Sequence, residues 1–340
     1  FLFRKVLPAV APCIKDFSLK MSVPSEDPDP EFISFISSEM MRMFPLGWDR
    51  KWKGSVLGTT PRSSSCLESS RKKGGWAGLL ARHEVLSRSE FCEELMNKYS
   101  RVKPSVDKVR VMRALCDGKE RIVTVNSVDM GYLDPFHRLL YDRVAEQDWC
   151  LRGEANSRRF SDFVQKDGEV FVSGDYESAT DNLNQNVARH ILVCLSRSCT
   201  HVPLWVREAA YRTLSCSATS KFGSFEVRRG QLMGNSMSFP LLCLFNYLTF
   251  KFLIRREVPL KINGDDIVFR STPEEYSTWA DAVGRCGLTL SRGKTAVSPR
   301  WFSLNSTFFV SGTKKVKEAP VLRSTCFFKP VEDALSIVGR

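Results

Sequence analysis

The sequence predicts an α+β fold in which an antiparallel sheet is flanked by helices. Residues 261–270 place apolar side chains on both sides of Asn-Gly-Asp-Asp, which is typical of two strands joined by a tight turn. A short apolar segment, Glu169 to Ser173, predicts a further strand. Apolar residues at helical spacing between Asn182 and Ser196 predict an amphipathic helix, and the apolar run from Leu241 to Ile254 predicts a buried one.

The composition is typical of a globular protein that binds a polyanion. The 340 residues carry a formal net charge of +12, and such a surplus of Lys and Arg suits a nucleic acid partner. The eleven cysteines include no Cys-x-x-Cys pair, so we expect free thiols in a reducing compartment. The most apolar segment is interrupted by Asn246, Thr249 and Lys251, which favours a buried helix over a membrane span.

Two adjacent carboxylates, Asp265 and Asp266, lie at the tip of the predicted hairpin, directly after Gly264. Their negative charges repel each other unless a cation lies beside them. Hard oxygen ligands favour Mg²⁺ or Mn²⁺, so the two residues are candidate metal ligands. Taken alone, an ordinary surface turn rich in Asn, Gly and Asp is the simpler explanation.

Further carboxylates follow the predicted strand that ends at Ser173. Asp175 comes directly after this strand, and Asp181 lies in the polar turn that leads to the next helix. Folds that combine strands and helices place chemistry at such strand ends. Asp175 is therefore a candidate site residue.

The segment from Gly230 to Pro240 predicts a loop followed by a helix. Gly230 and Gly234, four residues apart, allow the backbone to approach a ligand closely. Ser238 is predicted to cap the helix, with Pro240 in the first turn, where its missing N–H costs nothing.

Lys119 and Arg121 are predicted to point to the same face of the second of two strands between Asp107 and Val125. Two such cations can hold a triphosphate, because Arg makes bidentate contacts and Lys supplies a point charge. A solvated edge strand with protective charges is the alternative. The basic segment from Thr59 to Gly75 is expected to be a loop, with or without a contact to RNA.

The region after the hairpin predicts an amphipathic helix from Pro273 to Gly284 and a strand from Gly287 to Ser291. A turn then contains Lys294, and Phe302 to Val310 predicts a second hairpin.

Taken in order, these segments resemble the palm motifs of viral RNA-dependent RNA polymerases, and within that group the ourmia-like (botourmiavirus) and narnavirus branch of positive-strand RNA viruses. The matched region runs from about residue 107 to 310. The matching segments are Gly174-Asp175 with Asp181 (motif A), Gly230 to Pro240 with the helix to Asn246 (motif B), Gly264-Asp265-Asp266 (motif C, a GDD motif), Gly287 to Lys294 (motif D), Asn305 to Phe309 (motif E) and Gly118 to Thr124 (motif F). In one departure, Asn246 lies eight residues past Ser238, whereas many relatives place an Asn only a few residues after the corresponding Ser or Thr.

The resemblance implies a right-hand polymerase of fingers, palm and thumb, with an antiparallel palm sheet, that transfers nucleotides to a 3′-OH and releases pyrophosphate. It implies two Mg²⁺ or Mn²⁺ ions on Asp175, Asp265 and Asp266, with Lys294 as a further catalytic residue. It also implies a nucleotide site formed by Lys119, Arg121, Asp181, Ser238 and Asn246, and an RNA-binding loop containing Gly230 and Gly234. The implied partners are template and product RNA and ribonucleoside triphosphates, in the host cytoplasm or, alternatively, in mitochondria.

The expected domain organisation follows the motif order. An N-terminal extension with part of the fingers (1–105) precedes the fingers with motif F (106–172), palm motif A (173–184), a fingers insertion (185–228), palm motifs B to E (229–310) and the start of an incomplete thumb (311–340).

Two other functions fit parts of the sequence. A reverse transcriptase shares the palm, and Tyr176 supplies an aromatic residue near motif A, but a hydrogen-bonding Asp181 favours ribonucleotides. A non-catalytic RNA-binding protein of the nucleocapsid type explains the positive charge but gives the spaced carboxylates no purpose.

Overall fold

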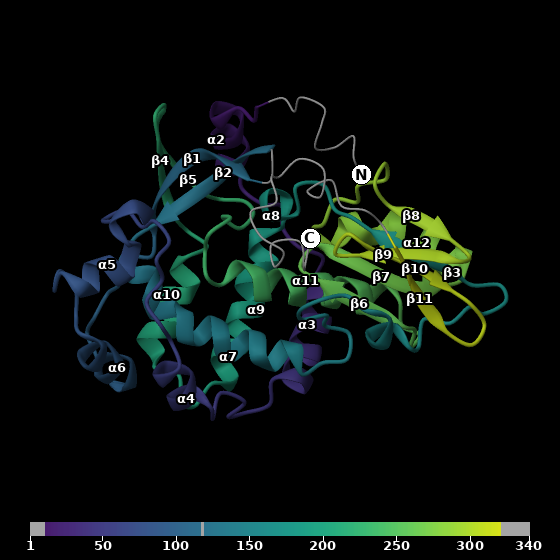
Figure 1. Ribbon diagram of the computed structural model, residues 1–340, viewed down its shortest axis with the longest axis horizontal. Helices are drawn as coiled ribbons and strands as arrows, with labels where there is room; N and C mark the ends of the chain where they lie inside the picture. The colour runs from purple at the N-terminus through teal and green to yellow at the C-terminus, as the bar shows by residue number, and fades with distance from the viewer. Residues whose placement is uncertain (1–10, 117–118, 321–340) are drawn as a thin grey trace, which may run out of the picture.

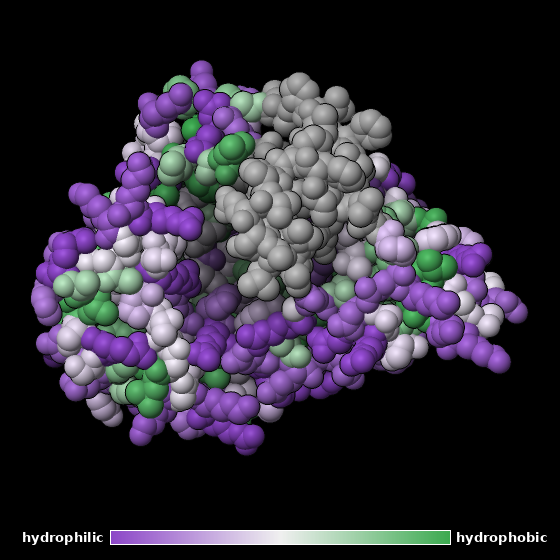
Figure 2. Space-filling model, in the orientation of Figure 1, coloured by the Kyte–Doolittle hydropathy of each residue, from purple (hydrophilic) through white to green (hydrophobic). Residues whose placement is uncertain are grey.

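The computed structural model describes residues 11–116 and 119–320, apart from the side chains of Cys116 and Lys119. Within this part, helices and three sheets form a mixed α and β structure, as predicted (Figure 1). Most helices lie in the centre and lower left of Figure 1, one four-stranded sheet lies above them, and the other two sheets lie on the right. Figure 2 shows a mostly hydrophilic face on which hydrophobic residues form small groups.

The sheet that carries most of the predicted site residues has the strand order β6-β7-β3-β8, and we call it the β3 sheet. All its pairings are antiparallel. Its strands are β6 (Leu260–Asn263), β7 (Asp266–Ser271), β3 (Val170–Gly174) and β8 (Ala296–Ser298). The predicted hairpin and the predicted strand before Asp175 are therefore confirmed as β6-β7 and β3.

Helices pack against the β3 sheet and against one another in a continuous apolar core. The most buried of them is α11 (Ser238–Leu253), which is apolar nearly all round, as predicted. The other long helices are α3 (Pro30–Met43), α7 (Asp134–Ala145), α9 (Gln185–Ser198), α10 (Leu204–Arg212) and α12 (Pro273–Ala282). Among the residues that the structure describes, no helix combines the length and the apolar character needed to cross a bilayer.

A second sheet, the β1 sheet, has the strand order β2-β1-β4-β5. Its strands are β1 (Lys108–Cys116), β2 (Lys119–Asn126), β4 (Ser217–Ser220) and β5 (Gly223–Glu226). β1 and β2 form the predicted antiparallel pair, whereas β1 and β4 are parallel. The helix α2 (Ile14–Ser22) buries Ile14 and Met21 against this sheet.

The remaining strands and short helices connect these units. The third sheet contains β9 (Trp301–Leu304), β10 (Thr307–Ser311) and β11 (Val316–Ala319), and it includes the predicted second hairpin. The short helices are α4 (Trp52–Leu57), α5 (Gly75–Ala81), α6 (Arg88–Met96) and α8 (Ala179–Asn182), with 3₁₀ turns at Arg71–Lys73, Val128–Leu133, Ser157–Phe160 and Val283–Cys286. The segment from Thr59 to Gly75 is mostly loop, as predicted.

Two local predictions are wrong. The segment from Gly287 to Ser291 is not a strand: only Leu290 forms an isolated bridge, to Tyr176, and β8 takes the edge of the sheet instead. Ser238 does not cap α11, because Met237 occupies the cap position and the Ser238 hydroxyl donates to the backbone oxygen of Leu232. The preceding loop, and not solvent, therefore satisfies this hydroxyl.

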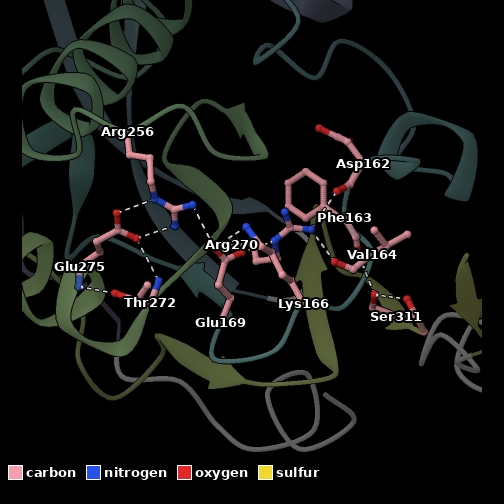
Figure 3. Close-up of polar contacts among 11 residues, drawn as sticks. Asp162, Phe163, Val164, Lys166, Glu169, Arg256, Arg270, Thr272, Glu275 and Ser311 are labelled. Carbon is pink, nitrogen blue, oxygen red and sulfur yellow. Dashed lines mark hydrogen bonds and ion pairs between the residues drawn. The ribbon is translucent and has the colours of Figure 1, made fainter. Parts of the chain in front are cut away.

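An ion-pair network closes the end of the β3 sheet that lies away from the predicted hairpin turn. Glu169, just before β3, accepts from Arg270 of β7 at 2.6 Å and pairs with Arg256 at 2.9 Å. Figure 3 shows both guanidinium groups reaching Glu169, with Arg256 also bound to Glu275 at the start of α12. A shift of one residue between β3 and β7 would exchange the two faces of a strand, so these pairs help to fix the register that aligns the other end.

Candidate active site

Three carboxylates lie at one end of the β3 sheet. In the β3-β7 register Gly174 is opposite Ile267, so Asp175, which follows β3, and Asp266, the first residue of β7, lie at the same edge of the sheet. Asp265 lies in the two-residue turn between β6 and β7. The other turn residue, Gly264, has φ +65°, a left-handed conformation that glycine adopts without a steric penalty.

The electrostatics of this cluster reflect crowded negative charge. Burial, together with the charges of Asp265 and Asp175, raises the pKa of Asp266 to about 6. The pKa of Asp265 is also raised, mainly by burial and in addition by the negative charge of Asp175. A cation placed among these groups would relieve the repulsion and lower both pKa values.

Two predicted cations lie beside the carboxylates. The Lys294 ammonium nitrogen is 3.3 Å from Oδ2 of Asp175, and its side chain is 49% exposed. Arg121 and Lys294 are both close enough to lower the pKa of Asp265. The structure thus brings together Asp175, Asp265, Asp266, Arg121 and Lys294, whereas the Lys119 side chain is outside the described part.

The donor chemistry of the cluster suits a hard divalent ion, because carboxylate oxygens are the ligands that Mg²⁺ and Mn²⁺ prefer. Among the described residues, no group of three His, Cys, Asp or Glu side chains is arranged to hold an ion. The assignment of two ions to Asp175, Asp265 and Asp266 stays a prediction, supported by the crowding that raises the pKa values of Asp265 and Asp266.

Asp181 lies next to the start of the predicted RNA-binding loop. Gly230 donates its N–H to the Leu183 oxygen, and Gln231 donates to the Thr180 oxygen at 2.6 Å. Gly230 has φ +69°, and a Cβ atom there would lie 2.4 Å from the Thr180 oxygen, so only glycine permits this approach. Burial raises the pKa of Asp181.

Asp181 does not cap the following helix. Asn184 does so, because its side-chain oxygen accepts from the backbone N–H groups of Asn186 and Val187. The Asp181 carboxylate accepts a hydrogen bond from the Thr180 hydroxyl at 3.3 Å. Helix capping therefore does not explain the Asp181 carboxylate, and its role in sugar selection stays a prediction.

The loop from Gly230 to Met237 is held on both sides. Thr124 of β2 donates its N–H to the Met233 oxygen, and Asn126 donates to the Gly234 oxygen at 2.9 Å. On the other side, the Ser236 hydroxyl donates to the Asp134 carboxylate at 2.9 Å, and burial raises the pKa of that carboxyl to about 6. These contacts connect the loop to the strand that carries Arg121.

Asn246 has a position that the sequence did not predict. Its fully buried amide accepts from the Tyr176 hydroxyl at 2.8 Å and donates to the Gly264 oxygen at 3.1 Å. It therefore connects the residue after Asp175 to the turn that contains Asp265. The ribose contact of Asn246 stays a prediction. Tyr176 is 2% exposed, and its hydroxyl is bound to Asn246 inside the protein.

No protein family model matches the chain. Over 196 residues it is 29% identical to a curated protein named "RNA-dependent RNA polymerase" from Ourmia melon virus (isolate Melon/Iran/VE9). The aligned segment covers 50% of this chain and 22% of that polymerase, so the chain matches about a fifth of the length of its relative.

Proposed function

We propose that this chain forms the catalytic palm and part of the fingers of an enzyme that copies viral RNA. Its resemblance to viral RNA-dependent RNA polymerases of the ourmia-like branch is confirmed by its similarity to the Ourmia melon virus protein. The observation that carries the proposal is the set of three carboxylates, Asp175, Asp265 and Asp266, at one end of an antiparallel sheet with two cations beside them. In this proposal the β3 sheet is the palm, and the β1 sheet belongs to the fingers.

The proposed reaction joins a ribonucleotide to a primer or product 3′-OH and releases pyrophosphate, so it depends on positioning and on neutralised charge. Two Mg²⁺ or Mn²⁺ ions on Asp175, Asp265 and, more weakly, Asp266 would lower the pKa of the 3′-OH and neutralise the triphosphate. The contact between Lys294 and Asp175 supports this charge balance, because Lys294 already supplies a cation where the carboxylates gather.

The chain's other residues would bind and orient the nucleotide. Arg121, with Lys119, would hold the triphosphate through charge-assisted hydrogen bonds. Asp181, Ser238 and Asn246 would contact the ribose, directly or by shaping its pocket. The loop that begins at Gly230 would contact template and product, and the net charge of +12 would give salt-sensitive binding of RNA.

A primer-extension assay with the expressed chain tests the proposal. We expect incorporation of ribonucleotides on an RNA template that requires Mg²⁺ or Mn²⁺ and stops with a chelator. Incorporation of deoxyribonucleotides alone would instead identify a reverse transcriptase. RNA binding without any incorporation, with or without divalent ions, would contradict the enzymatic proposal and favour a nucleocapsid-type protein.

Asp181→Ala is expected to reduce the preference for ribonucleotides over deoxyribonucleotides. A site that hydrogen-bonds a hydroxyl rejects an analogue without it by large factors, up to about 10⁴–10⁵-fold. We therefore expect the ratio of kcat/KM for ATP over dATP to fall at least ~10-fold. Thr180→Val, which removes only the hydroxyl that binds Asp181, serves as the matched control. An unchanged ratio in Asp181→Ala would remove Asp181 from the sugar site.

Lys294→Arg and Lys294→His separate charge from proton donation. General acid catalysis contributes about 10²–10⁴-fold, and Arg keeps the charge of Lys but does not readily give up a proton. We expect single-turnover incorporation by Lys294→Arg to be at least ~10-fold slower than wild type. In Lys294→His the optimum should move to lower pH, because His donates near neutral pH. If Arg and Lys give the same rate and pH profile, Lys294 acts only through its charge.

A further inference from the structure

Two thiols lie directly beneath the turn that carries Asp265. Cys243 of α11 is fully buried, and its Sγ accepts the N–H of Gly264 at 3.2 Å. Cys150 lies in the segment after α7, which is joined to β6 by hydrogen bonds from Ile262 to Trp149 and from Leu151 to Ile262, each 2.8 Å. An isolated bridge between Cys150 and Ile262 brings Cys150 next to the strand that leads into Gly264, and each thiol is the largest influence on the pKa of the other.

Cys150 faces a polar cavity at the surface. The cavity has a volume of about 390 Å³, and its lining includes Cys150, three cationic residues and three acidic ones (Arg158, Arg159, Lys261, Glu146, Asp148 and Asp162). Cys150 is 4% exposed, whereas Cys243 is fully covered. Cys150 therefore borders a space that a small oxidant can enter.

The surroundings make the two thiols unequal. The hydrogen bond from Cys243 lowers the pKa of Cys150, and Arg152, Arg159 and Lys261 act in the same direction against the effect of burial. The same contact and burial raise the pKa of Cys243. A thiol with a lowered pKa beside a second thiol is the one that oxidants attack first, because the thiolate is the nucleophile.

We propose that Cys150 and Cys243 form a peroxide-sensitive pair that closes a reversible disulfide beneath the Gly264–Asp266 turn. The Cys150 thiolate attacks one oxygen of the peroxide, the O–O bond breaks, and the leaving hydroxide takes a proton to become water. Cys150 is then a sulfenic acid. Cys243 attacks its sulfur, the S–O bond breaks, the thiol proton leaves with the hydroxide as a second water, and the S–S bond forms. The two thiols lose two electrons in total, and one peroxide is reduced.

Disulfide formation would disturb the catalytic turn. A disulfide joins its two segments covalently and allows only a narrow range of geometries, so closing it would draw α11 and the segment around Cys150 together. Cys243 is the acceptor of the Gly264 N–H, and this shift would move the turn that holds Asp265. A displacement of about 1 Å in an active site can cost ~10²-fold in rate. This effect on rate rests on the proposed polymerase function, whereas formation of the disulfide does not.

The test treats the full chain with hydrogen peroxide and measures both the bond and the activity. Trypsin should release residues 144–152 and 230–251, each with one cysteine, and non-reducing mass spectrometry should find them linked. We expect incorporation to fall at least ~10-fold after peroxide and to return with dithiothreitol. Cys150→Ser should be as active as wild type in reductant and should keep its activity in peroxide. The control Cys13→Ser, which removes an exposed thiol at the start of α2, should be as sensitive as wild type.

Three results would overturn the proposal: no linked peptides, linked peptides in an active enzyme that loses no activity, or equal loss in Cys150→Ser. If Cys150→Ser does not fold, the linked peptides and the recovery of wild type with dithiothreitol decide the question. A chain that forms the linked peptides but is inactive before oxidation contradicts the polymerase function and leaves the disulfide itself intact.

Discussion

Asp175→Asn and Asp265→Asn are each expected to lower divalent-ion-dependent incorporation at least ~10³-fold. Each change removes a negative charge from the cluster at the edge of the β3 sheet, and charge stabilisation by bound ions is worth several kcal/mol in the transition state. Each loss of about 1.36 kcal/mol costs a factor of ten in rate. Primer extension with a short RNA duplex and saturating ribonucleotides measures the effect.

RNA binding separates this catalytic loss from misfolding. Affinity for RNA depends on basic residues elsewhere, so Kd should stay within about twofold of wild type in both variants. Asp142→Asn provides a matched control, because Asp142 pairs with Arg152 on the surface and such exposed pairs contribute little. Incorporation by either active-site variant within tenfold of wild type would remove that residue from the catalytic set.

Glu169→Gln is expected to lower the free energy of unfolding by about 3–5 kcal/mol at pH 7. Its side chain is 5% exposed, and the change would leave Arg270, 12% exposed, without its charged partner. Removing one member of a buried pair carries a cost of this size. Glu275→Gln is the control. Glu275 is 25% exposed, its ion-pair partner among the described residues is Arg256, and glutamine can still accept the Thr272 N–H, so we expect a loss below about 1 kcal/mol.

The effect of Glu169 should depend on pH. Burial alone would raise its pKa, but the hydrogen bonds from Arg270 and Arg256 outweigh burial and hold the pKa below its usual value of 4.5. A lowered pKa in the folded state gives stability that is present above the unfolded-state pKa and is lost as the pH falls through the folded-state pKa. Urea unfolding should therefore show a difference between wild type and Glu169→Gln that shrinks below about pH 4. A difference that is the same at pH 7 and pH 3 would contradict this.

Local patterns were sufficient to predict the elements that carry the candidate site. The Asn-Gly-Asp-Asp break between apolar runs predicted the turn with Asp265, because a tight turn needs a residue such as Gly264 in the left-handed conformation. The apolar run before Asp175 predicted β3, and the apolar run after Ser238 predicted a buried helix. These features depend on neighbours in the sequence.

Where a feature depends on partners far away in the sequence, the prediction was wrong or was not made. Residues 287–291 have the composition of a strand, but a strand needs an open edge, and β8 occupies that edge with Ala-Val-Ser. The buried amide of Asn246 satisfies groups from two other elements, and no local pattern encodes such a contact. The same holds for Glu169, whose partners Arg256 and Arg270 lie about 90–100 positions later in the sequence.

The strand order of the two four-stranded sheets also bears on how the chain is made. β3 takes both of its neighbours, β7 and β8, from residues that follow it, and β1 gains its parallel partner β4 only after β3 has been synthesised. A ribosome releases the N-terminal part first, so neither sheet can be completed independently as a finished domain during translation. Nascent chains that stop before residue 266 would carry β3 with no strand on either side, and such unpaired edges are sites of aggregation.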